Sequence, residues 1–313
     1  MSTIVISEFM DEAAVREILS GFDVRHDATL VDKPDELAAL LKDARALIVR
    51  NRTQVRDELL AAGPWLECIG RLGVGLDNID MDACRKRGIA VYPATGANEI
   101  SVAEYVIGAI IVLLRGAFYA TPAVIAGTWP RNSLPGRDVS GKTLGLIGYG
   151  NNARETATRA LALGMQVSAH DPNVPTDHPA WTRVSGKVHP ATLEDIITGS
   201  DALSIHVPLL PGTRNLIDGR AIERMRKGAI VINAARGGIV EETAVVAALK
   251  SGQLGGAALD VFTQEPLTAS AGALFADCPN LILTPHIAGV TLEANIRTSR
   301  ITAENVRRHL AGG

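Results

Sequence analysis

The sequence predicts an α/β protein made of two doubly wound parallel-sheet domains. Two observations lead to this fold class. Short apolar runs rich in β-branched residues alternate with helical patterns along the whole 313-residue chain, as in parallel sheets covered by helices. A long helical stretch over residues 99–119, EISVAEYVIGAIIVLLRGAFY, divides this alternation into two blocks. We therefore expect one sheet before this stretch and another after it.

Each block supplies its own strands. The first block is expected to form strands at residues 3–9, 22–28, 46–51, 66–73 and 89–94, with helices between them such as 11–21 and 34–44. The second block is expected to form strands at residues 142–148, 165–170, 202–208, 229–235, 256–262 and 281–286. These strands are nearly all apolar, which is typical of sheets buried on both faces. The last helical stretch, residues 291–313, is amphipathic and follows the last strand, so it could return to the first domain.

The composition is that of an ordinary globular protein. Hydrophobic residues make up 47% of the chain and the net charge is −3, so we expect no general attraction to nucleic acid or to an anionic membrane. The three cysteines, Cys68, Cys84 and Cys278, form no Cys-x-x-Cys pair and fit a reducing cytoplasm. The amino terminus, MSTIVISEFMDE, does not resemble a signal peptide, and the run VIGAIIVLLRG is too short to span a bilayer. We expect a cytoplasmic protein without a metal site.

The stretch LGLIGYGNNARETA, residues 144–157, has the pattern of a dinucleotide-binding turn. Gly148-x-Gly150-x-x-Ala153 lies between an expected strand and an expected helix. In such a turn the first glycine permits the tight bend, and the second lets the backbone approach a pyrophosphate. The third position packs helix against strand, for which alanine is small enough. Asn151 and Asn152 would offer backbone N–H groups to an anion at the start of the helix.

A carboxylate is expected at the end of the next strand. The segment VSAHDP places Asp171 beyond that strand, where a carboxylate accepts hydrogen bonds from ribose hydroxyls and repels a 2′-phosphate. The combination of strand, turn, helix and carboxylate predicts NAD rather than NADP. The alternative is an ordinary glycine turn with a helix-capping aspartate.

Three later strands end in residues suited to hydride transfer between a hydroxy acid and NAD. They are NAARGG with Arg236, LDVFTQEP with Asp260 and Glu265, and TPHIAG with His286. Histidine is the natural base near neutral pH, and a carboxylate such as Glu265 can orient the imidazole. The guanidinium of Arg236 can grip the substrate carboxylate or polarise its carbonyl. Taken singly, each of these residue types is more often a surface or packing residue.

Together these motifs resemble the D-isomer-specific 2-hydroxyacid dehydrogenase family, which includes phosphoglycerate dehydrogenase. The resemblance rests on Gly148–Ala153, Asp171, INAARGG, ALDVFTQEP and TPHIAG, and it extends to RLGVGLDNIDMDACRKRGIAV and GANEISVAE in the first block. It implies a Rossmann NAD-binding domain at residues 98–287, inserted in a flavodoxin-like substrate domain at residues 1–97 and 288–313. It also implies a homodimer and, because the chain ends at Gly313, a short form without a regulatory domain.

The resemblance implies roles for individual residues. Arg236, Glu265 and His286 would be catalytic, with His286 as the acid/base, and Asp260 would lie near the nicotinamide carboxamide. The substrate would be bound by Arg50, Arg52, Val74, Gly75, Asn98, Arg236 and His286. The cofactor would be bound by Gly148, Gly150, Asn151, Asn152, Asp171, Ala234, Ala235, Arg236, Asp260, His286, Ile287, Ala288 and Gly289.

Two positions depart from the family pattern. Asn151-Asn152 replaces the usual Arg-Ile, and Ala153 replaces the usual glycine. Because the phosphate contacts in such turns are largely backbone contacts, we expect an altered cofactor affinity rather than a lost one. Glu265 is retained, whereas formate dehydrogenases of this superfamily carry glutamine there, which argues against formate.

The stretch ALIVRNRTQV indicates the substrate. Arg50 and Arg52 alternate at an expected strand end, so both should point to the same side. The segment resembles the Arg-Ser-Arg-Thr stretch of bacterial phosphoglycerate dehydrogenases, in which the arginines face the substrate phosphate. Two guanidinium groups exceed what one carboxylate needs, so we expect an anionic group on C3, as in 3-phosphoglycerate or 3-sulfolactate. The alternative is that the arginines form surface ion pairs with nearby acidic residues.

Other functions are compatible with the same motifs. A hydroxypyruvate or glyoxylate reductase is the alternative within the reaction class. NAD-dependent oxidation of phosphite or formate would use the same scaffold on another substrate. An NAD-sensing corepressor, which keeps the same side chains but binds partner peptides, represents a different class of function.

Overall fold

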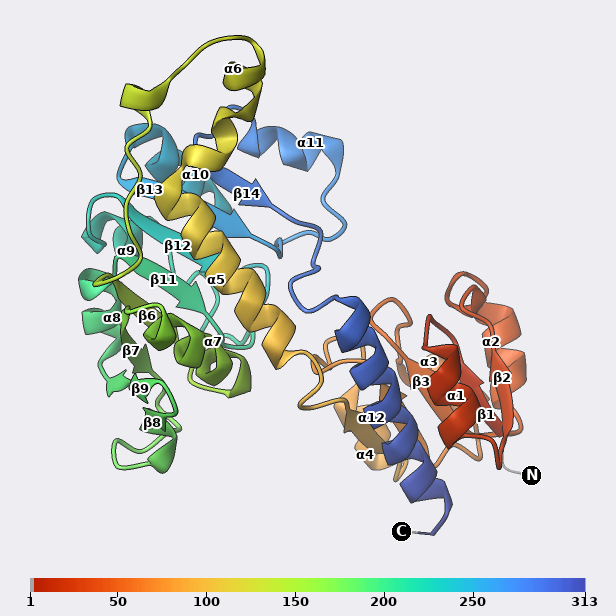
Figure 1. The fold of residues 1–313 in the computed structure, drawn as a ribbon. Helices are drawn as coiled ribbons and strands as arrows, with labels where there is room; N and C mark the ends of the chain where they lie inside the picture. The colour runs from red at the N-terminus through yellow and green to blue at the C-terminus, as the bar shows by residue number, and fades with distance from the viewer. Residues whose placement is uncertain (1–2, 313) are drawn as a thin grey trace. The chain divides into compact units, whose positions relative to one another are not determined.

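The computed structural model describes residues 3–312, which divide into two units (Figure 1). Unit 1 runs up to Asn98 and resumes at Val290, and unit 2 comprises Glu99–Gly289. These divisions lie one residue after 97 and two residues after 287. Glu99 is the first residue of a long helix of unit 2, and Ala288 is hydrogen-bonded to Asp260 of the same unit, which explains the positions of the divisions.

Unit 1 contains a sheet of five parallel strands in the order β2-β1-β3-β4-β5. Its register pairs Val5 with Leu47, and Ile48 with Gly70. The strands are β1 (Thr3–Ile6), β2 (Asp23–His26), β3 (Ala44–Val49), β4 (Cys68–Arg71) and β5 (Ala90–Pro93).

The side chains of this sheet alternate between two covered faces. One face, which includes Val5 and Leu47, packs against α2, α3 and α4. The opposite face, which includes Ile4 and Ile48, packs against α12, which also runs beside α1. The helices are α1 (Glu12–Ile18), α2 (Pro34–Leu41), α3 (Asp57–Ala62), α4 (Met81–Lys86) and α12 (Leu292–Leu310), with the short η1 (Leu30–Asp32). The last helical stretch thus returns to the first sheet.

Unit 2 contains a sheet of seven parallel strands in the order β10-β7-β6-β11-β12-β13-β14, and a separate antiparallel pair, β8 and β9. Every strand predicted from the second block is present. The strands are β6 (Thr143–Ile147), β7 (Gln166–His170), β8 (Thr182–Arg183), β9 (Gly186–Lys187), β10 (His189–Pro190), β11 (Ala202–Ile205), β12 (Ala229–Asn233), β13 (Leu254–Leu259) and β14 (Leu281–Leu283).

Helices cover both faces of this sheet as well. One core joins Leu144, Leu146 and Ile230 to α5 and α7, and the other joins Leu203 and Val231 to α8, α9 and α10. The helices are α5 (Glu99–Arg115), α6 (Thr121–Ile125), α7 (Asn151–Ala162), α8 (Leu193–Gly199), α9 (Gly219–Arg224), α10 (Glu242–Ser251) and α11 (Ala269–Gly272), with η2 (Ala117–Ala120), η3 (Arg131–Ser133), η4 (Pro179–Trp181) and η5 (Ala273–Phe275). The predicted fold class, two doubly wound parallel sheets, is confirmed.

The order of the strands places a switch point in each sheet. In unit 1, β1 lies between β2 and β3, and in unit 2, β6 lies between β7 and β11. Ligands of doubly wound sheets bind beyond the carboxyl ends of the strands at such points. The loops that follow β1 and β3, and those that follow β6 and β11, are therefore the places where function is expected.

Two sequence-based boundaries are wrong. The helix predicted over residues 99–119 ends at Arg115, because Gly116 takes a left-handed φ of 60° and a separate 3-10 turn follows. The strand predicted over residues 46–51 ends at Val49, so Arg50 and Asn51 lie in a loop. Within residues 3–312, no single helix is long and apolar enough to cross a membrane. Only α5 together with Ala117–Ile125, bent by 64°, passes by length and composition, and most of the large side chains of α5 are buried in the core.

Candidate active site

The turn after β6 is shaped by its two glycines. Gly148 has a φ of 88°, and a Cβ placed on it would lie 2.6 Å from the carbonyl oxygen of His206, which follows β11. Gly150 precedes the first residue of α7, and a Cβ placed on it would meet no atom within 4 Å. Ala153 is fully buried between helix and sheet. The turn therefore combines a tight bend, an open space before a helix N-terminus and a close helix–strand contact.

Asn151 and Asn152 form the first turn of α7, as predicted. The amide nitrogen of Asn151 donates to Glu99 Oε1 at 3.3 Å, and the carbonyl of Asn152 accepts from Thr156 Oγ1 at 2.8 Å. The first backbone N–H groups of a helix have no partner within the helix, so this end of α7 can accept an anion.

Asp171 lies directly after β7, beside the glycine turn. Its Oδ2 accepts from the backbone N–H of Tyr149 at 2.8 Å, and its Oδ1 accepts from that of Asn173 at 2.9 Å. These two bonds fix the carboxylate next to the turn, and each oxygen retains a lone pair for a further donor. The residues present fit NAD: an open cradle at a helix N-terminus and a fixed carboxylate one strand away.

His286 and Glu265 form a hydrogen-bonded pair at the carboxyl ends of β13 and β14. His286 Nδ1 lies 2.7 Å from Glu265 Oε2, and Glu265 Oε1 accepts from the backbone N–H of Phe262 at 2.9 Å. Burial raises the pKa of Glu265, but the hydrogen bonds from His286 and Phe262 and the charges of His286 and Arg236 outweigh it and hold that pKa below 4.5. The carboxylate therefore stays ionised and can only accept, so Nδ1 carries the proton and Nε2 is the acceptor of the neutral ring.

Arg236 belongs to the loop after β12. Its Nη1 donates to the carbonyl of Ala235 at 2.6 Å, and its own carbonyl accepts from Asn233 Nδ2 at 2.9 Å. The next residue, Gly237, lies so close to the carbonyl of Phe262 that a Cβ there would clash with it. This close approach brings the Arg236 segment, with Ala234 and Ala235, to the loop that carries Glu265. The structure thus gathers the three predicted catalytic residues at one edge of the sheet.

Asp260 anchors the segment that carries His286. Its buried carboxylate accepts from Thr284 Oγ1 at 2.6 Å and from the backbone N–H groups of Ile287 and Ala288, both at 2.8 Å. Its carbonyl accepts from the N–H of His286 at 2.8 Å, and His286 has a left-handed φ of 57°. A non-glycine residue keeps such a conformation only when its surroundings impose it. The contacts seen for Asp260 are thus with residues 284–288, which lead to Gly289.

The predicted substrate residues lie at the carboxyl edge of the sheet in unit 1. Val74 and Gly75 belong to the loop after β4, and Asn98 follows β5. The side-chain Oδ1 of Asn98 is buried without a hydrogen-bond partner among residues 3–312, as expected of a group that meets a ligand.

Arg50 and Arg52 do not form the predicted pair on a strand. Both lie beyond the end of β3, so strand alternation does not orient them. Arg50 Nη2 donates to Asn295 Oδ1 of α12 at 2.8 Å, whereas Arg52 forms an exposed ion pair with Asp32. The alternative of a surface ion pair thus describes Arg52, and Arg50 is the more buried of the two.

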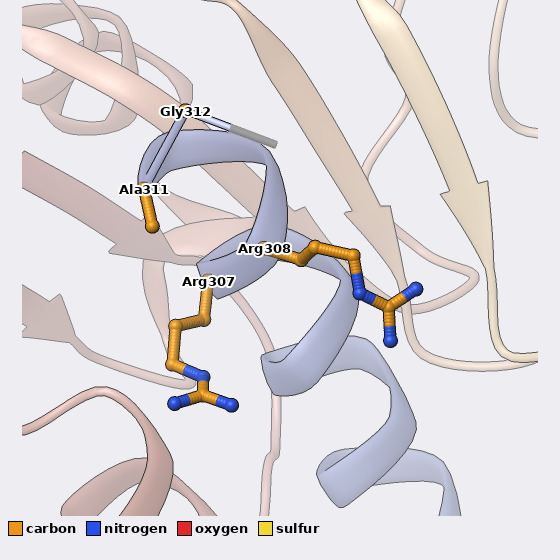
Figure 2. A pocket seen from close by; sticks show the side chains of 4 residues that line it. All are labelled: Arg307, Arg308, Ala311 and Gly312. Carbon is orange, nitrogen blue, oxygen red and sulfur yellow. The ribbon is translucent and has the colours of Figure 1, made fainter.

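Two hollows of unit 1 were not anticipated from the sequence. One of about 570 Å³ lies at the carboxyl ends of β1 and β2, where Phe9 and His26 line it, and Arg50 lies over the ring of Phe9, 6.0 Å from its centroid. The other lies at the end of α12, where Arg307 and Arg308 extend to different sides of the last turn (Figure 2). Cations at a helix C-terminus are the usual partners of the helix dipole, so the second hollow indicates no chemistry.

Sequence reasoning missed Glu8, a buried residue that follows β1. Its carboxylate accepts hydrogen bonds from the loop of Arg50 and Arg52. The available signal was its place: an acidic residue two positions beyond an apolar strand, at the edge where ligands bind.

Residues 107–288 match the family model described as D-isomer specific 2-hydroxyacid dehydrogenase, NAD binding domain. The chain is 56% identical over 310 residues to a protein of Chromohalobacter salexigens named (S)-sulfolactate dehydrogenase, covering 99% of each chain. It is 36% identical over 306 residues to a hydroxypyruvate reductase of Thermotoga maritima, covering 97% of each. It is 37% identical over 314 residues to a D-3-phosphoglycerate dehydrogenase of Mycobacterium leprae, covering 100% of this chain and 57% of that relative.

Among solved structures, a D-lactate dehydrogenase of Aquifex aeolicus complexed with NAD and lactic acid superposes with a TM-score of 0.83 at 27% identity, covering 99% of this chain and 97% of that one.

Proposed function

We propose, from the premise that this chain belongs to the D-isomer specific 2-hydroxyacid dehydrogenase family, that its substrate is a D-type 2-hydroxy acid with an anionic group on C3. The chain is an NAD-dependent oxidoreductase that interconverts a 2-hydroxy acid and its 2-oxo acid. 3-Sulfolactate is the leading substrate. The observation that carries this choice is the 56% identity, over nearly the whole chain, to the relative named (S)-sulfolactate dehydrogenase. A D-type centre takes the label S in sulfolactate, because the sulfur-bearing arm outranks the carboxylate.

His286 is proposed as the acid/base of the reaction. With Nδ1 bound to Glu265 Oε2 at 2.7 Å, its Nε2 can take the proton of the substrate hydroxyl when the hydroxy acid is oxidised, and return it in the reverse direction. Glu265 orients the ring and stabilises the imidazolium that forms. Arg236 holds the substrate carboxylate or polarises the carbonyl of the oxo acid.

The Gly148–Asn152 turn and Asp171 are proposed to hold NAD, with the ribose hydroxyls on Asp171 and the pyrophosphate at the start of α7. NAD supplies the two-electron chemistry by accepting or donating a hydride at its nicotinamide ring. The segments Ala234–Arg236 and His286–Gly289 complete the proposed cofactor site. Asp260 keeps the second of these segments in place through its three hydrogen bonds.

Unit 1 is proposed to bind the acid groups of the substrate. The backbone of Val74 and Gly75 and the side chain of Asn98 would meet the carboxylate end. Arg50 is the main candidate for the C3 anion, because it is more buried and the exposed Arg52 already faces Asp32. A phosphate on C3, as in 3-phosphoglycerate, is the second candidate, which the similarity to phosphoglycerate dehydrogenases favours. Hydroxypyruvate reduction is the candidate without a C3 anion, and the Thermotoga relative favours it.

Kinetics of NADH oxidation with two arginine variants test the substrate assignment. The acids compared are 3-sulfopyruvate, 3-phosphohydroxypyruvate, hydroxypyruvate, glyoxylate and pyruvate. We expect Arg50→Ala to raise KM for the C3-anionic acids by about tenfold or more, as the loss of one charged hydrogen bond predicts, and to leave hydroxypyruvate kinetics nearly unchanged. Arg52→Ala is expected to have the smaller effect. Equal effects of Arg50→Ala on all five acids would refute the role of Arg50 in recognising C3.

We also propose that the protein is a cytoplasmic homodimer. Six large apolar side chains are exposed in the segment 117–134, which we call the apolar arm: Phe118, Tyr119, Val124, Ile125, Trp129 and Leu134. Ile125 and Trp129 are 82% and 77% exposed. Figure 1 shows the arm, in yellow and green, extending from the end of α5. Exposed apolar patches of this kind mark interfaces, so a second copy of the chain is the proposed occupant. The free thiols of Cys68, Cys84 and Cys278 support a reducing compartment.

A further inference from the structure

The loop that carries Arg50 and Arg52 is built around one buried carboxylate. Glu8 is 4% exposed, and its two oxygens accept hydrogen bonds from four successive backbone N–H groups. Glu8 Oε1 accepts from Arg50 at 2.8 Å and from Thr53 at 3.0 Å. Glu8 Oε2 accepts from Arg52 at 3.1 Å and from Asn51 at 3.4 Å. The N–H groups of this loop therefore point to Glu8 and not to a ligand.

Further buried groups hold the same loop. Asn78 Nδ2 donates to the carbonyl of Thr53 at 2.7 Å and to that of Arg50 at 3.3 Å. The hydroxyls of Ser7 and Thr53 are 2.9 Å apart and hydrogen-bonded. With backbone donors and acceptors both engaged inside unit 1, the loop has only its side chains to offer to an anion.

The charge of Glu8 is maintained by these contacts. Burial raises the pKa of Glu8, but the hydrogen bonds from Thr53, Arg50 and Arg52 outweigh it and bring that pKa below its ordinary value of 4.5. The ionised carboxylate also attracts the guanidinium of Arg50, whose pKa burial lowers and Glu8 raises. Arg50 is thus fixed at three points: its backbone on Glu8, its Nη2 on Asn295 Oδ1 and its guanidinium over Phe9.

We propose that Glu8 is a positioning residue for recognition of the C3 anion. It does not touch the substrate but fixes the Arg50–Thr53 loop, so that the guanidinium of Arg50 is already oriented when the anion arrives. Such preorganisation removes part of the ordering cost of binding. The inference rests on the proposed function, because it needs a substrate with a charged group on C3. It assigns the specificity for that group to a carboxylate on a different strand from the arginine that binds it.

The test compares Glu8→Gln with the wild type on two acids that differ at C3, 3-sulfopyruvate and hydroxypyruvate. The glutamine has the shape of glutamate, but its amide nitrogen cannot accept, so two of the loop N–H groups lose their partner. We expect KM for 3-sulfopyruvate to rise about tenfold or more, as the loss of bonds to a charged acceptor predicts. We expect kcat for that acid and both constants for hydroxypyruvate to stay near wild type.

Two further variants make the comparison specific. Glu67→Gln removes another half-exposed carboxylate of unit 1, which pairs with Arg45 and does not contact the loop, so both acids should be used as by wild type. Asn78→Ala removes the tether to the loop carbonyls and should reproduce the selective rise in KM, which keeps the test valid if Glu8→Gln does not fold. Circular dichroism and the fluorescence of bound NADH identify the folded variants.

The outcomes separate this inference from the proposed function. Equal losses on both acids, or an unchanged KM for 3-sulfopyruvate in folded Glu8→Gln and Asn78→Ala, would overturn the role of Glu8 and leave the substrate assignment intact. If the wild type prefers 3-phosphohydroxypyruvate, the same comparison is made with that acid. If the wild type uses neither C3-anionic acid, the proposed substrate class fails, and the role of Glu8 fails with it.

Discussion

His286 is the residue on which the proposed chemistry depends most directly. Its Nδ1 is engaged by Glu265 Oε2 at 2.7 Å, which leaves Nε2 to exchange the proton with the substrate. We predict that His286→Ala lowers kcat by about 10²–10⁴, the usual contribution of a general acid/base. NADH affinity should change little, because the glycine turn and Asp171 are untouched. Stopped-flow kinetics and fluorescence titration measure the two quantities.

His189→Ala is the matched control for this prediction, since His189 is an exposed histidine of unit 2 on β10. Its kcat should equal that of wild type. A His286→Ala enzyme with near-normal kcat would remove His286 from the mechanism, and a large loss of NADH affinity would assign it to cofactor binding instead.

Glu265 also gives the stability of the fold a pH dependence. Burial raises its pKa, but hydrogen bonds and the charges of His286 and Arg236 bring the pKa below 4.5 in the folded protein. A lowered pKa stabilises the folded state at pH values above the unfolded-state pKa, and this contribution is lost as the pH falls through the folded-state value. We predict that Glu265→Gln lowers the free energy of unfolding at pH 7 and that the difference from wild type shrinks below pH 4.5. Urea unfolding at several pH values measures it. A difference independent of pH would contradict the prediction.

At the scale of single elements, the sequence predicted what local geometry dictates. The turn from β6 to α7 was predictable because Gly148 must adopt a positive φ and Ala153 must be small, and both requirements are visible as residue types. Asp171 was predictable from its distance along the chain. The grouping of Arg236, Glu265 and His286 followed from the rule that parallel strands end at one edge.

Features set by contacts between distant segments were not predictable in the same way. The end of β3 depends on its pairing with β1 and β4, so the apolar run could not show that Arg50 already lies in the loop. The partner of Arg52 lies on η1, and the carboxylate beneath the loop comes from the residues after β1. The end of α5 was missed because apolar residues continue past Gly116, although Phe118 is exposed and not part of the core.

Gly150 allows the cofactor turn to be tested as an element. Its backbone is extended, with φ of −78°, and a Cβ there would meet nothing within 4 Å, so Gly150→Ala should fold as wild type does. The added methyl group would nevertheless occupy the space that a pyrophosphate needs. We predict unchanged thermal stability and an NADH Kd raised by about tenfold or more, in line with 1–3 kcal/mol for an overpacked site. Isothermal calorimetry and thermal unfolding measure the two effects.

Gly148→Ala is the contrasting variant. Here the added methyl group would lie 2.6 Å from the carbonyl of His206 and the backbone requires a positive φ, so stability should fall together with NADH binding. If Gly150→Ala bound NADH as tightly as wild type does, the turn would not be the pyrophosphate site.

At the scale of the whole molecule, the apolar arm bears on the assembly state. Its side chains are too exposed to contribute to the core of unit 2, and a second copy would bury them. We predict that Ile125→Asp combined with Trp129→Asp converts the dimer to a monomer, as measured by analytical ultracentrifugation. Trp65→Asp is the control, because Trp65 is 69% exposed in unit 1, outside the arm. A wild type that sediments as a monomer would contradict the assignment.

The central claim is that this dehydrogenase recognises a charge on C3 of its substrate. The most direct test is the ratio of kcat/KM for 3-sulfopyruvate to that for hydroxypyruvate, measured with the wild-type protein and NADH. The account predicts a ratio of about 10² or more, because a hydrogen-bonded charge pair contributes about 1.5–3 kcal/mol. A ratio near one, or a preference for hydroxypyruvate, would contradict it and make the protein a general 2-oxo acid reductase.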